Sequence, residues 1–584
     1  MCGKTVPTFS EEHASTVWLI AAIVAMFLLL CFYYRPYFGI DDSNIYQVYG
    51  ANLAHGYGWV YHAGSERVEG TTSFLYTLLW ALTFMTPWPQ LVMHMVNLIC
   101  ALVALLTALR TIQYLVGVPK STQQMDLYLI VYLLWIALNP GALTWTTVTL
   151  MDMSLWAVLI VAAVYVTCRF AREQNAVYYS KAMSLIGGLM ALTRPESMLL
   201  VPIMILLAAR VSYAFNGSAK LALRTIAVPF TVFATITGIL TLFRHFYFGY
   251  PFPNTYYAKV SADHFYNLYI GLLYLYGFLH RYPLLLILLT IAALVAWHSA
   301  TEWPLKKKEY TRHLALITAV LAAFALVLVP ILTGGDHFPQ GRFFVPAILI
   351  LPLPCISLLP AGIDWPASWR VRQMVTLGWV VLFILIASLQ NFRLDDSLQE
   401  EFDIAAQGRQ MGEILNQLFP GKAKPTVGVI AAGGIAATYD GYVIDVLGLN
   451  NTLIAHSTSE RFGKKNHAAF SAAAFYKLAP DLFSVYPITP ETQTDGDPRR
   501  NGWWPDDWTQ YIRNESAFRE SYEPVELWFR NQDLGRPSST LTGSGSAVDW
   551  LMRPRFGKPI ALALFMKRRV AEQMKESRQC ELKN

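Results

Sequence analysis

The chain has 584 residues, of which 54% are hydrophobic, 14% aromatic and only 14% charged. Soluble chains carry about 25% charged residues, so this composition excludes a disordered chain, a coiled coil and a small disulfide scaffold and indicates a membrane protein. The net charge is only +6 and is spread along the chain, and no nucleic-acid partner is therefore expected.

Apolar stretches of about 20 residues, long enough to cross a membrane as a helix, recur along the first two thirds of the chain. The first covers residues 16–34. Its flank lacks the short basic segment and the cleavage site of a secretory signal, so this helix is expected to be retained. The sequence predicts about eleven transmembrane helices, which begin near Thr16, Pro89, Asp126, Met151, Ala182, Ser197, Leu221, Pro283, Leu314, Phe343 and Met374.

The loops between these helices predict an orientation. With the N-terminus in the cytoplasm, nearly every cluster of basic residues falls on the inner side, as the positive-inside rule requires. The apolar run 74–86 in the first outer loop, residues 35–88, is too short to cross and is interpreted as a juxtamembrane helix. We therefore expect a bacterial inner (plasma) membrane protein whose tail lies in the periplasm or extracytoplasmic space.

Acidic residues mark the tail as a different kind of structure. Of the 39 Asp and Glu residues, 15 precede Asn391 and the other 24 follow it (39 − 15 = 24). A helical stretch at 394–418 precedes two short strand-like runs, at 426–431 and 442–449, a pattern typical of a small α/β domain. The predicted fold is a polytopic α-helical membrane domain, residues 1–391, followed by an extracytoplasmic α/β domain, residues 392–584.

Two adjacent carboxylates, Asp41 and Asp42, directly follow the first helix at its expected outer end. Transfer of an activated sugar to a hydroxyl needs a base that takes the acceptor proton as the new bond forms. Neighbouring carboxylates repel, and one of them can thereby keep a raised pKa. Asp41 is favoured as the base and Asp42 as its partner, although the sequence gives little ground for choosing between them. A hydrated aspartate pair that ends a helix is the alternative interpretation.

Four basic residues come from three other outer loops: Arg194, Lys259, His337 and Arg342. Guanidinium groups match phosphate oxygens in a two-point geometry, so these side chains are predicted to bind the phosphate of a donor. They would also stabilise the negative charge that builds on this phosphate as the sugar leaves. The alternative, strongest for Lys259, is a long side chain that simply reaches the lipid headgroups.

The same loops hold further candidates for substrate binding: Glu69, Trp145, Glu196, Asn254, Tyr256, Tyr257 and Asp336. The aromatic residues suit stacking on a sugar or a prenyl chain, but aromatic side chains also form the ordinary belt at membrane interfaces. Glu196 is expected to pair with Arg194. No metal-binding motif occurs, although Asp336 and His337 leave a divalent metal open as a cofactor.

Several short strings stand in one order along residues 41–451: the aspartate pair, YGANLAHGYG at 49–58, RVEGTTS at 67–73, LTRPE at 192–196, PNTYYAK at 253–259, GGD at 334–336, GVIAAG at 428–433 and IDVLGLN at 444–450. Together they resemble membrane glycosyltransferases of the GT-C superfamily, and most of all the mycobacterial-type arabinofuranosyltransferases (AftB-like). Each string alone is weak, but their common order is fairly specific.

The resemblance implies a polyprenyl-phosphate-linked sugar donor such as decaprenylphosphoryl arabinose, an inverting transfer, and a catalytic carboxylate at Asp41 or Asp42. This sequence departs from the family pattern at residues 150–153, which read LMDM in place of GMET, and at Tyr46 and Gln47. These departures leave the acceptor open: a glycan, or a secreted protein such as a pilin.

The predicted activity is transfer of a pentofuranose, arabinofuranose being favoured, from a polyprenyl phosphate in the lipid bilayer to an extracytoplasmic acceptor. A hexose or aminoarabinose transferase is the alternative within enzymes. A transporter or lipid flippase is less favoured, because transporters place polar groups near the membrane midplane and show repeats, whereas here the polar groups gather at one interface.

Overall fold

The computed structural model describes twelve segments of the chain, together with Ile512 and a few single residues between 286 and 294. The described segments are residues 9–116, 122–139, 141–260, 263–284, 307–356, 369–393, 397–457, 470–488, 514–528, 551–554, 559–577 and 581–583.

Long apolar helices make up most of these segments. Eight stretches of the described chain are long and apolar enough to cross a membrane. They lie in α1 (Phe9–Tyr34), α4 (Pro89–Val116), α7 (Met153–Glu173), α9 (Ser197–Asn216), α10 (Ala219–Phe248), α14 (Lys307–Thr333), the run of η1 (Pro339–Phe344), α15 (Val345–Ile350) and α16 (Pro352–Ile356), and α17 (Trp369–Arg393). The chain is therefore a multi-pass helical membrane protein, as its sequence predicts.

The predicted number of spans, about eleven, is larger than these helices account for. A bent pair, α5 (Thr122–Ala137) and α6 (Gly141–Thr147), meets at 83° and makes one further candidate. Helix α8 (Ala176–Thr193) packs against α7 and α10. Polar residues in its first two turns make it less apolar than the eight helical stretches named above. The segment predicted to begin near Pro283 lies largely outside the described residues.

Helix α7 lies at the centre of the bundle. It packs against α4, α8, α9 and α14, and small buried residues such as Ala157, Ala163 and Ala171 line its length. Small side chains let neighbouring helix backbones approach closely, which is how helices associate in a membrane. The bundle therefore has a packed core that holds the ends of these helices in fixed positions.

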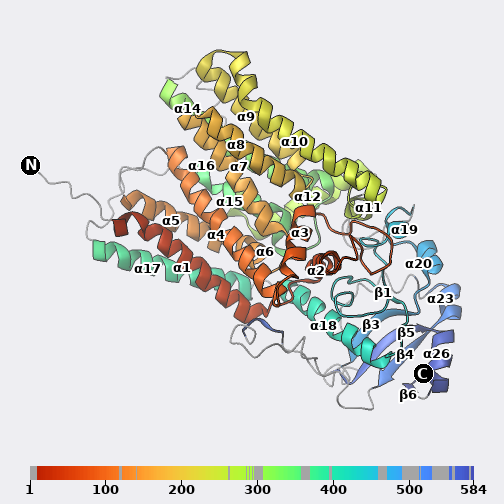
Figure 1. Ribbon diagram of the computed structural model, residues 1–584. Coiled ribbons are helices and arrows are strands. Elements are labelled where there is room, and N and C mark those ends of the chain that lie inside the picture. The colour runs from red at the N-terminus through yellow and green to blue at the C-terminus, as the bar shows by residue number, and fades with distance from the viewer. Residues whose placement is uncertain are drawn as a thin grey trace, which may run out of the picture.

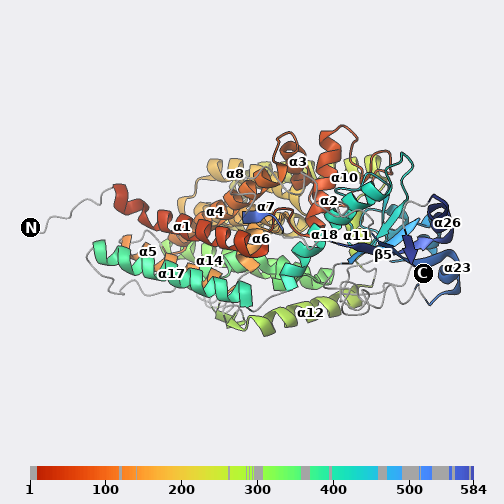
Figure 2. The same ribbon diagram turned by 90° about the horizontal axis from the view of Figure 1, so that it is seen from below.

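Shorter helices cover one end of the bundle, between it and the sheet (Figure 1). These are α2 (Asp41–Ala54), α3 (Phe74–Thr83) and α11 (Asn254–Lys259), while α12 (His264–Arg281) runs along one side of the bundle (Figure 2). The 10 residues of α3 rise about 15 Å, too little to cross a bilayer. Helix α3 thus has the length and composition predicted for a juxtamembrane helix.

The tail begins with α18 (Ser397–Leu418) and continues into a six-stranded mixed sheet with short helices, beyond the end of the bundle (Figure 1). Strand β1 is parallel to both of its neighbours, β2 and β3, whereas the other pairs are antiparallel. The strand order is β2 (Val443–Asp445), β1 (Val427–Val429), β3 (Leu482–Ile488), β5 (Ala561–Lys567), β4 (Tyr522–Trp528) and β6 (Glu581–Lys583). The helices are α19 (Thr452–Ala455), α20 (Ala472–Leu478), α23 (Ser516–Ser521) and α26 (Arg568–Ser577).

The tail shares a hydrophobic core with residues 35–88, the segment between α1 and α4. Val48 and Tyr49 of α2 and Trp59 belong to the same buried cluster as Ile414 of α18 and Leu562 of β5. The predicted domain boundary after Asn391 falls in the last turn of α17. The two parts nevertheless meet over a continuous apolar contact, and this contact fixes the tail against the loop that carries the aspartate pair.

A second contact ties the far end of the tail to the bundle. The segment 551–554 returns to the link between α1 and α2, where the backbone N–H of Tyr37 donates to the carbonyl of Met552 at 3.0 Å. Arg35 donates to the carbonyl of Leu551 at 2.9 Å, and the Met552 side chain is buried in the core of the bundle. The sheet is thus anchored to the bundle through both α18 and this segment.

Candidate active site

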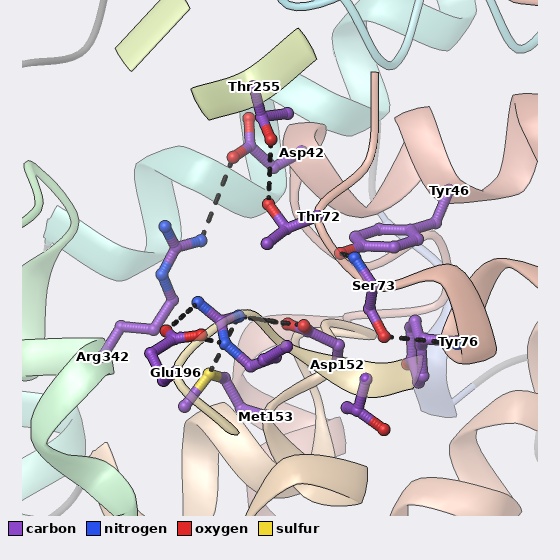
Figure 3. A network of polar contacts seen from close by, with 12 residues as sticks. Asp42, Tyr46, Thr72, Ser73, Tyr76, Asp152, Met153, Glu196, Thr255 and Arg342 are labelled. Atoms are coloured by element: carbon purple, nitrogen blue, oxygen red, sulfur yellow. Dashed lines mark hydrogen bonds and ion pairs between the residues drawn. The ribbon is translucent and has the colours of Figure 1, made fainter. Parts of the chain in front are cut away.

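A pocket lies at the end of the bundle, where α2, the segment after Glu69, α11 and η1 meet (Figure 3). It is lined by Asp42, Ile45, Tyr46, Gly70, Thr71, Thr72, Met151, Asp152, Arg194, Thr255, Lys259, Arg342, Phe343 and Leu449. Residues from seven separate stretches of the sequence therefore meet at one place.

Asp42 is a charged group of this pocket that belongs to the first turn of α2. Carboxylates are favourable there because the helix dipole places partial positive charge at the N-terminus. Its Oδ2 lies 3.5 Å from Nζ of Lys259 and 3.9 Å from Nη1 of Arg342. Figure 3 shows the Asp42 and Arg342 side chains facing each other across the pocket. One carboxylate thus faces two cations.

Asp41 points elsewhere, because consecutive residues of a helix are turned by about 100°. Its two carboxylate oxygens accept hydrogen bonds from the backbone N–H groups of Gly433 (2.9 Å) and Gly434 (2.7 Å) in the tail. Burial raises the pKa of Asp41 to about 6, although both hydrogen bonds act to lower it. Asp42, and not Asp41, lines the pocket.

The guanidinium of Arg342 is fixed by a carboxylate and two aromatic rings. Its Nε lies 2.7 Å from Oδ2 of Asp336, and its guanidinium lies 4.4 Å from the ring centre of Phe338 and 5.5 Å from that of Trp145. Burial alone would raise the pKa of Asp336, but Arg342 and His337 together hold it well below its usual range. Asp336 therefore stays ionised and fixes the guanidinium with Nη1 towards Asp42.

The backbone before Arg342 is unusual. Gln340 and Gly341 have φ angles of +59° and +61°, a left-handed conformation that costs energy for a residue with a side chain. A Cβ on Gly341 would overlap the ring of Phe278. The glycine in this segment therefore allows the close contact with α12 that places Arg342 at the pocket.

Arg194 is shared by two carboxylates. Its Nη1 donates to both oxygens of Asp152 (3.1 and 2.9 Å), and its Nε and Nη2 donate to Oε1 of Glu196 (3.0 and 2.9 Å). Figure 3 shows Asp152 and Glu196 on the side of the pocket opposite Asp42. Arg194 therefore lines the pocket with its charge neutralised by these two carboxylates.

Helix α11 faces the pocket with one side only. Thr255 and Lys259, four residues apart, line it, and the hydroxyl of Thr255 lies 3.3 Å from that of Thr72. Tyr256 is exposed, while Tyr257 contacts His456 with the ring centres 4.3 Å apart. These two tyrosines, predicted to bind substrate, lie outside the pocket.

Two other predicted substrate-binding residues have structural partners instead. Glu69 is buried and forms an ion pair with Arg244 of α10 at 2.7 Å. Asn254 donates from Nδ2 to the carbonyls of Gly448 (2.8 Å) and Leu449 (3.0 Å), which ties α11 to the tail. Neither side chain lines the pocket.

The sequence missed several residues that contribute to the site. Asp152 pairs with Arg194, Thr72 and Thr255 supply hydroxyls, and Arg409 of α18 contacts α2. The departure from the family pattern at residues 150–153 was a signal for Asp152. Within the described residues, His, Cys, Asp and Glu form no group of three or more arranged to hold a metal ion.

Comparisons with known proteins give matches of two kinds. Residues 397–542 match a domain of unknown function (DUF8728), and no curated protein sequence matches the chain. Solved structures are also similar to this chain. ArnT from Cupriavidus metallidurans, bound to undecaprenyl phosphate, is 10% identical with a TM-score of 0.47, and the match covers 83% of this chain and 94% of that one.

The archaeal oligosaccharyltransferase AglB from Archaeoglobus fulgidus, in complex with an inhibitory peptide and a dolichol-phosphate, is 12% identical (TM-score 0.45, 90% and 74% covered). The arabinosyltransferase EmbB from Mycobacterium smegmatis is 14% identical (TM-score 0.29, 71% and 44% covered).

Proposed function

We propose that this chain is an inverting membrane glycosyltransferase of the GT-C type, with Asp42 as the general base. The observation that carries this proposal is the arrangement of one carboxylate opposite two cations, 3.5 Å and 3.9 Å away, in a pocket that also presents the hydroxyls of Thr72 and Thr255. A base, an anion-binding pair and polar partners for a sugar are the groups that such a transfer needs.

The ion pairs of Asp42 are long compared with the 2.7 Å contact between Arg342 and Asp336. A donor phosphate that enters between them would replace Asp42 as the partner of Lys259 and Arg342. The carboxylate of Asp42 would then be free to accept a proton. Because Asp336 holds Nε of Arg342, the rest of the guanidinium stays available for the two-point hydrogen bonding that phosphates favour.

The transfer itself is a single displacement. Asp42 takes the proton of the acceptor hydroxyl while the hydroxyl oxygen attacks the anomeric carbon, and the bond from that carbon to the phosphate oxygen breaks. The polyprenyl phosphate leaves with an additional negative charge, which Lys259 and Arg342 stabilise. Attack on the face opposite the phosphate inverts the anomeric configuration.

A lipid-linked donor agrees with what lies beside the pocket. A second cavity shares Arg194 and Phe343 with it and is otherwise lined mainly by apolar side chains: Met153, Trp156, Leu326, Val329 and Pro330. This cavity is only about 10 Å³, so a prenyl chain would lie in the bilayer beside α14, whose Leu328 and Leu332 are exposed, while its phosphate reaches the polar pocket. This supports a polyprenyl phosphate over a soluble sugar nucleotide.

The resemblance of the sequence favours a pentofuranose, specifically arabinofuranose, as the sugar. A hexose or aminoarabinose transferase is the alternative, and the acceptor is a glycan or a secreted protein such as a pilin. We place the reaction at the extracytoplasmic face of the inner membrane, and residues 392–584 on that side.

The test uses purified full-length protein with a polyprenyl-phosphate arabinofuranose carrying a labelled sugar, in parallel with mannose and aminoarabinose donors. Asp42→Asn should lower transfer by about 10²–10⁴-fold, the usual loss when a general base is removed. The control is Asp440→Asn, since Asp440 is exposed on the tail. Full activity of Asp42→Asn with every donor would disprove the base assignment, and donor preference would name the sugar.

A further inference from the structure

The carboxylate of Asp41 is bound by a turn of the tail. Two consecutive backbone N–H groups, from Gly433 and Gly434, each donate to one of its oxygens. Successive N–H groups that converge in this way form an anion-binding concavity. The carboxylate is buried, so its two hydrogen bonds replace solvent and fix its position.

The turn fits so closely that only glycine is accommodated. A Cβ on Gly433 would overlap the carbonyl oxygen of Asp41 and would lie 2.9 Å from Cβ of Asn44. A Cβ on Gly434 would lie 2.9 Å from Cα of Gly408 on α18. The turn is therefore enclosed between α2 on one side and α18 on the other, with backbone contacts that cannot yield as a flexible side chain would.

Arg409 of α18 makes a second contact with the same helix. Its Nε donates to Oδ1 of Asn44 at 2.6 Å, its Nη2 donates to Oε1 of Gln47 at 2.8 Å, and its guanidinium lies 4.5 Å from the ring centre of Phe38. All of these groups are buried. The tail thus contacts the start of α2 at three positions, Asp41, Asn44 and Gln47.

Two faces of helix α2 make different contacts. Asp41, Asn44 and Gln47 recur about every three residues and face the tail, whereas Asp42, Ile45 and Tyr46 line the pocket. A small rotation of α2 about its axis would therefore move Asp42 relative to Lys259 and Arg342, which belong to other elements. A shift of about 1 Å in a reacting group can cost about 100-fold in rate.

We infer that Asp41, the Gly433–Gly434 turn and Arg409 are positioning residues, through which the tail sets the orientation of α2 and hence the place of Asp42. This inference rests on the proposed role of Asp42 as base. The tail contributes Leu449 to the lining of the pocket, and in addition it fixes the helix that carries Asp42.

Kinetics of the full-length protein test this inference. Asp41→Asn, Gly434→Ala and Arg409→Lys should each lower kcat by about 10–100-fold per folded molecule while the KM for the lipid donor changes less than about twofold, because Lys259 and Arg342 are untouched. Gly421→Ala is the matched control, since a Cβ there meets nothing within 4 Å, and it should keep wild-type kcat. Folding is checked by thermal unfolding in detergent.

A double-mutant cycle adds a readout that a general loss of stability would not produce. Asp41→Asn and Gly434→Ala remove the same contact, so the double variant should be no slower than the slower single variant, whereas independent effects would multiply. If Gly434→Ala fails to fold, the single variants Asp41→Asn and Arg409→Lys, measured beside Gly421→Ala, still test the inference. Wild-type kcat in Asp41→Asn and Arg409→Lys, with Asp42→Asn inactive, would overturn the positioning role and leave the proposed function intact. An active Asp42→Asn would instead refute the proposed function.

Discussion

The two carboxylate oxygens of Glu69 each accept a hydrogen bond from the guanidinium of Arg244, Oε2 from Nε at 2.7 Å and Oε1 from Nη2 at 2.8 Å. Both side chains are buried, and they connect the segment between α2 and α3 to the end of α10. The backbone carbonyl of Glu69 also accepts from the N–H of Asn254, so one residue joins the loop to α10 and to α11.

Arg244→Met is therefore expected to destabilise the protein by about 3–5 kcal/mol, because it leaves the Glu69 carboxylate buried without its partner. Thermal unfolding in detergent measures this effect. Arg169→Met is the control: Arg169 pairs with Glu173 at 2.7 Å, but both side chains are about one third exposed, and such pairs contribute less than about 1 kcal/mol. Equal losses in the two variants would contradict the structural role of the buried pair.

Lys259→Met should raise the KM for the lipid donor by about 10–100-fold, because a charge-assisted hydrogen bond to the donor phosphate is lost. Lys259→Arg keeps the charge and should retain most of the affinity. Donor titration at saturating acceptor measures both. An unchanged donor KM in Lys259→Met would assign Lys259 to the headgroup region of the bilayer instead.

Stability should also depend on pH through Asp445 of β2. Burial raises its pKa to about 6, even though Asn450 and Leu447 donate hydrogen bonds to it, whereas an Asp in an unfolded chain has a pKa of about 3.9. The native state therefore binds more protons between these values, and this group lowers stability as the pH rises from about 4 to about 6.

Above pH 6 the ionised carboxylate is expected to lower the free energy of unfolding by up to about 3 kcal/mol. Below pH 4 the group is protonated in both states and has no effect. Unfolding of wild-type protein and Asp445→Asn, compared at pH 4.5 and pH 7, isolates this contribution. The wild type should gain more stability at pH 4.5 than the variant does. A larger gain in the variant would mean that Asp445 is stabilised as the anion.

The proposed orientation predicts that a reporter fused after Asn584 is active only outside the cytoplasm. An enzyme that works only in the periplasm, such as alkaline phosphatase, should be active there, and a fusion after Gly217, between α9 and α10, should be inactive. The reverse pattern would place the pocket on the cytoplasmic side and would contradict the topology.

The apolar runs made the spans predictable, because length and hydrophobicity alone decide whether a helix can cross a bilayer. Helix α8 was harder, since Tyr178, Tyr179 and Lys181 make its start polar although it packs in the bundle. The strands β1 and β2 and helix α18 were also predicted within a few residues. These elements depend on local patterns, which a single sequence displays.

Only part of the predicted site lies at one place, and the roles predicted for its residues stay predictions. Asp42, Lys259 and Arg342 were all expected at the outer ends of helices and do line one pocket. Which aspartate faces that pocket depends on Gly433, which lies 392 residues beyond Asp41. The partner of Glu69 lies 175 residues away, and no local pattern marks such a pair.

The hydrogen bond from Tyr37 to Met552 has a consequence for how the protein is assembled. Segment 551–554 stands between β4 and β5 in the chain, so the stretch that joins these two strands runs past the link between α1 and α2. A soluble fragment made of the tail alone would expose Met552 and the apolar surface that α2 covers. We therefore expect the C-terminal third to need the membrane helices for its folding, and its expression in isolation should yield aggregates.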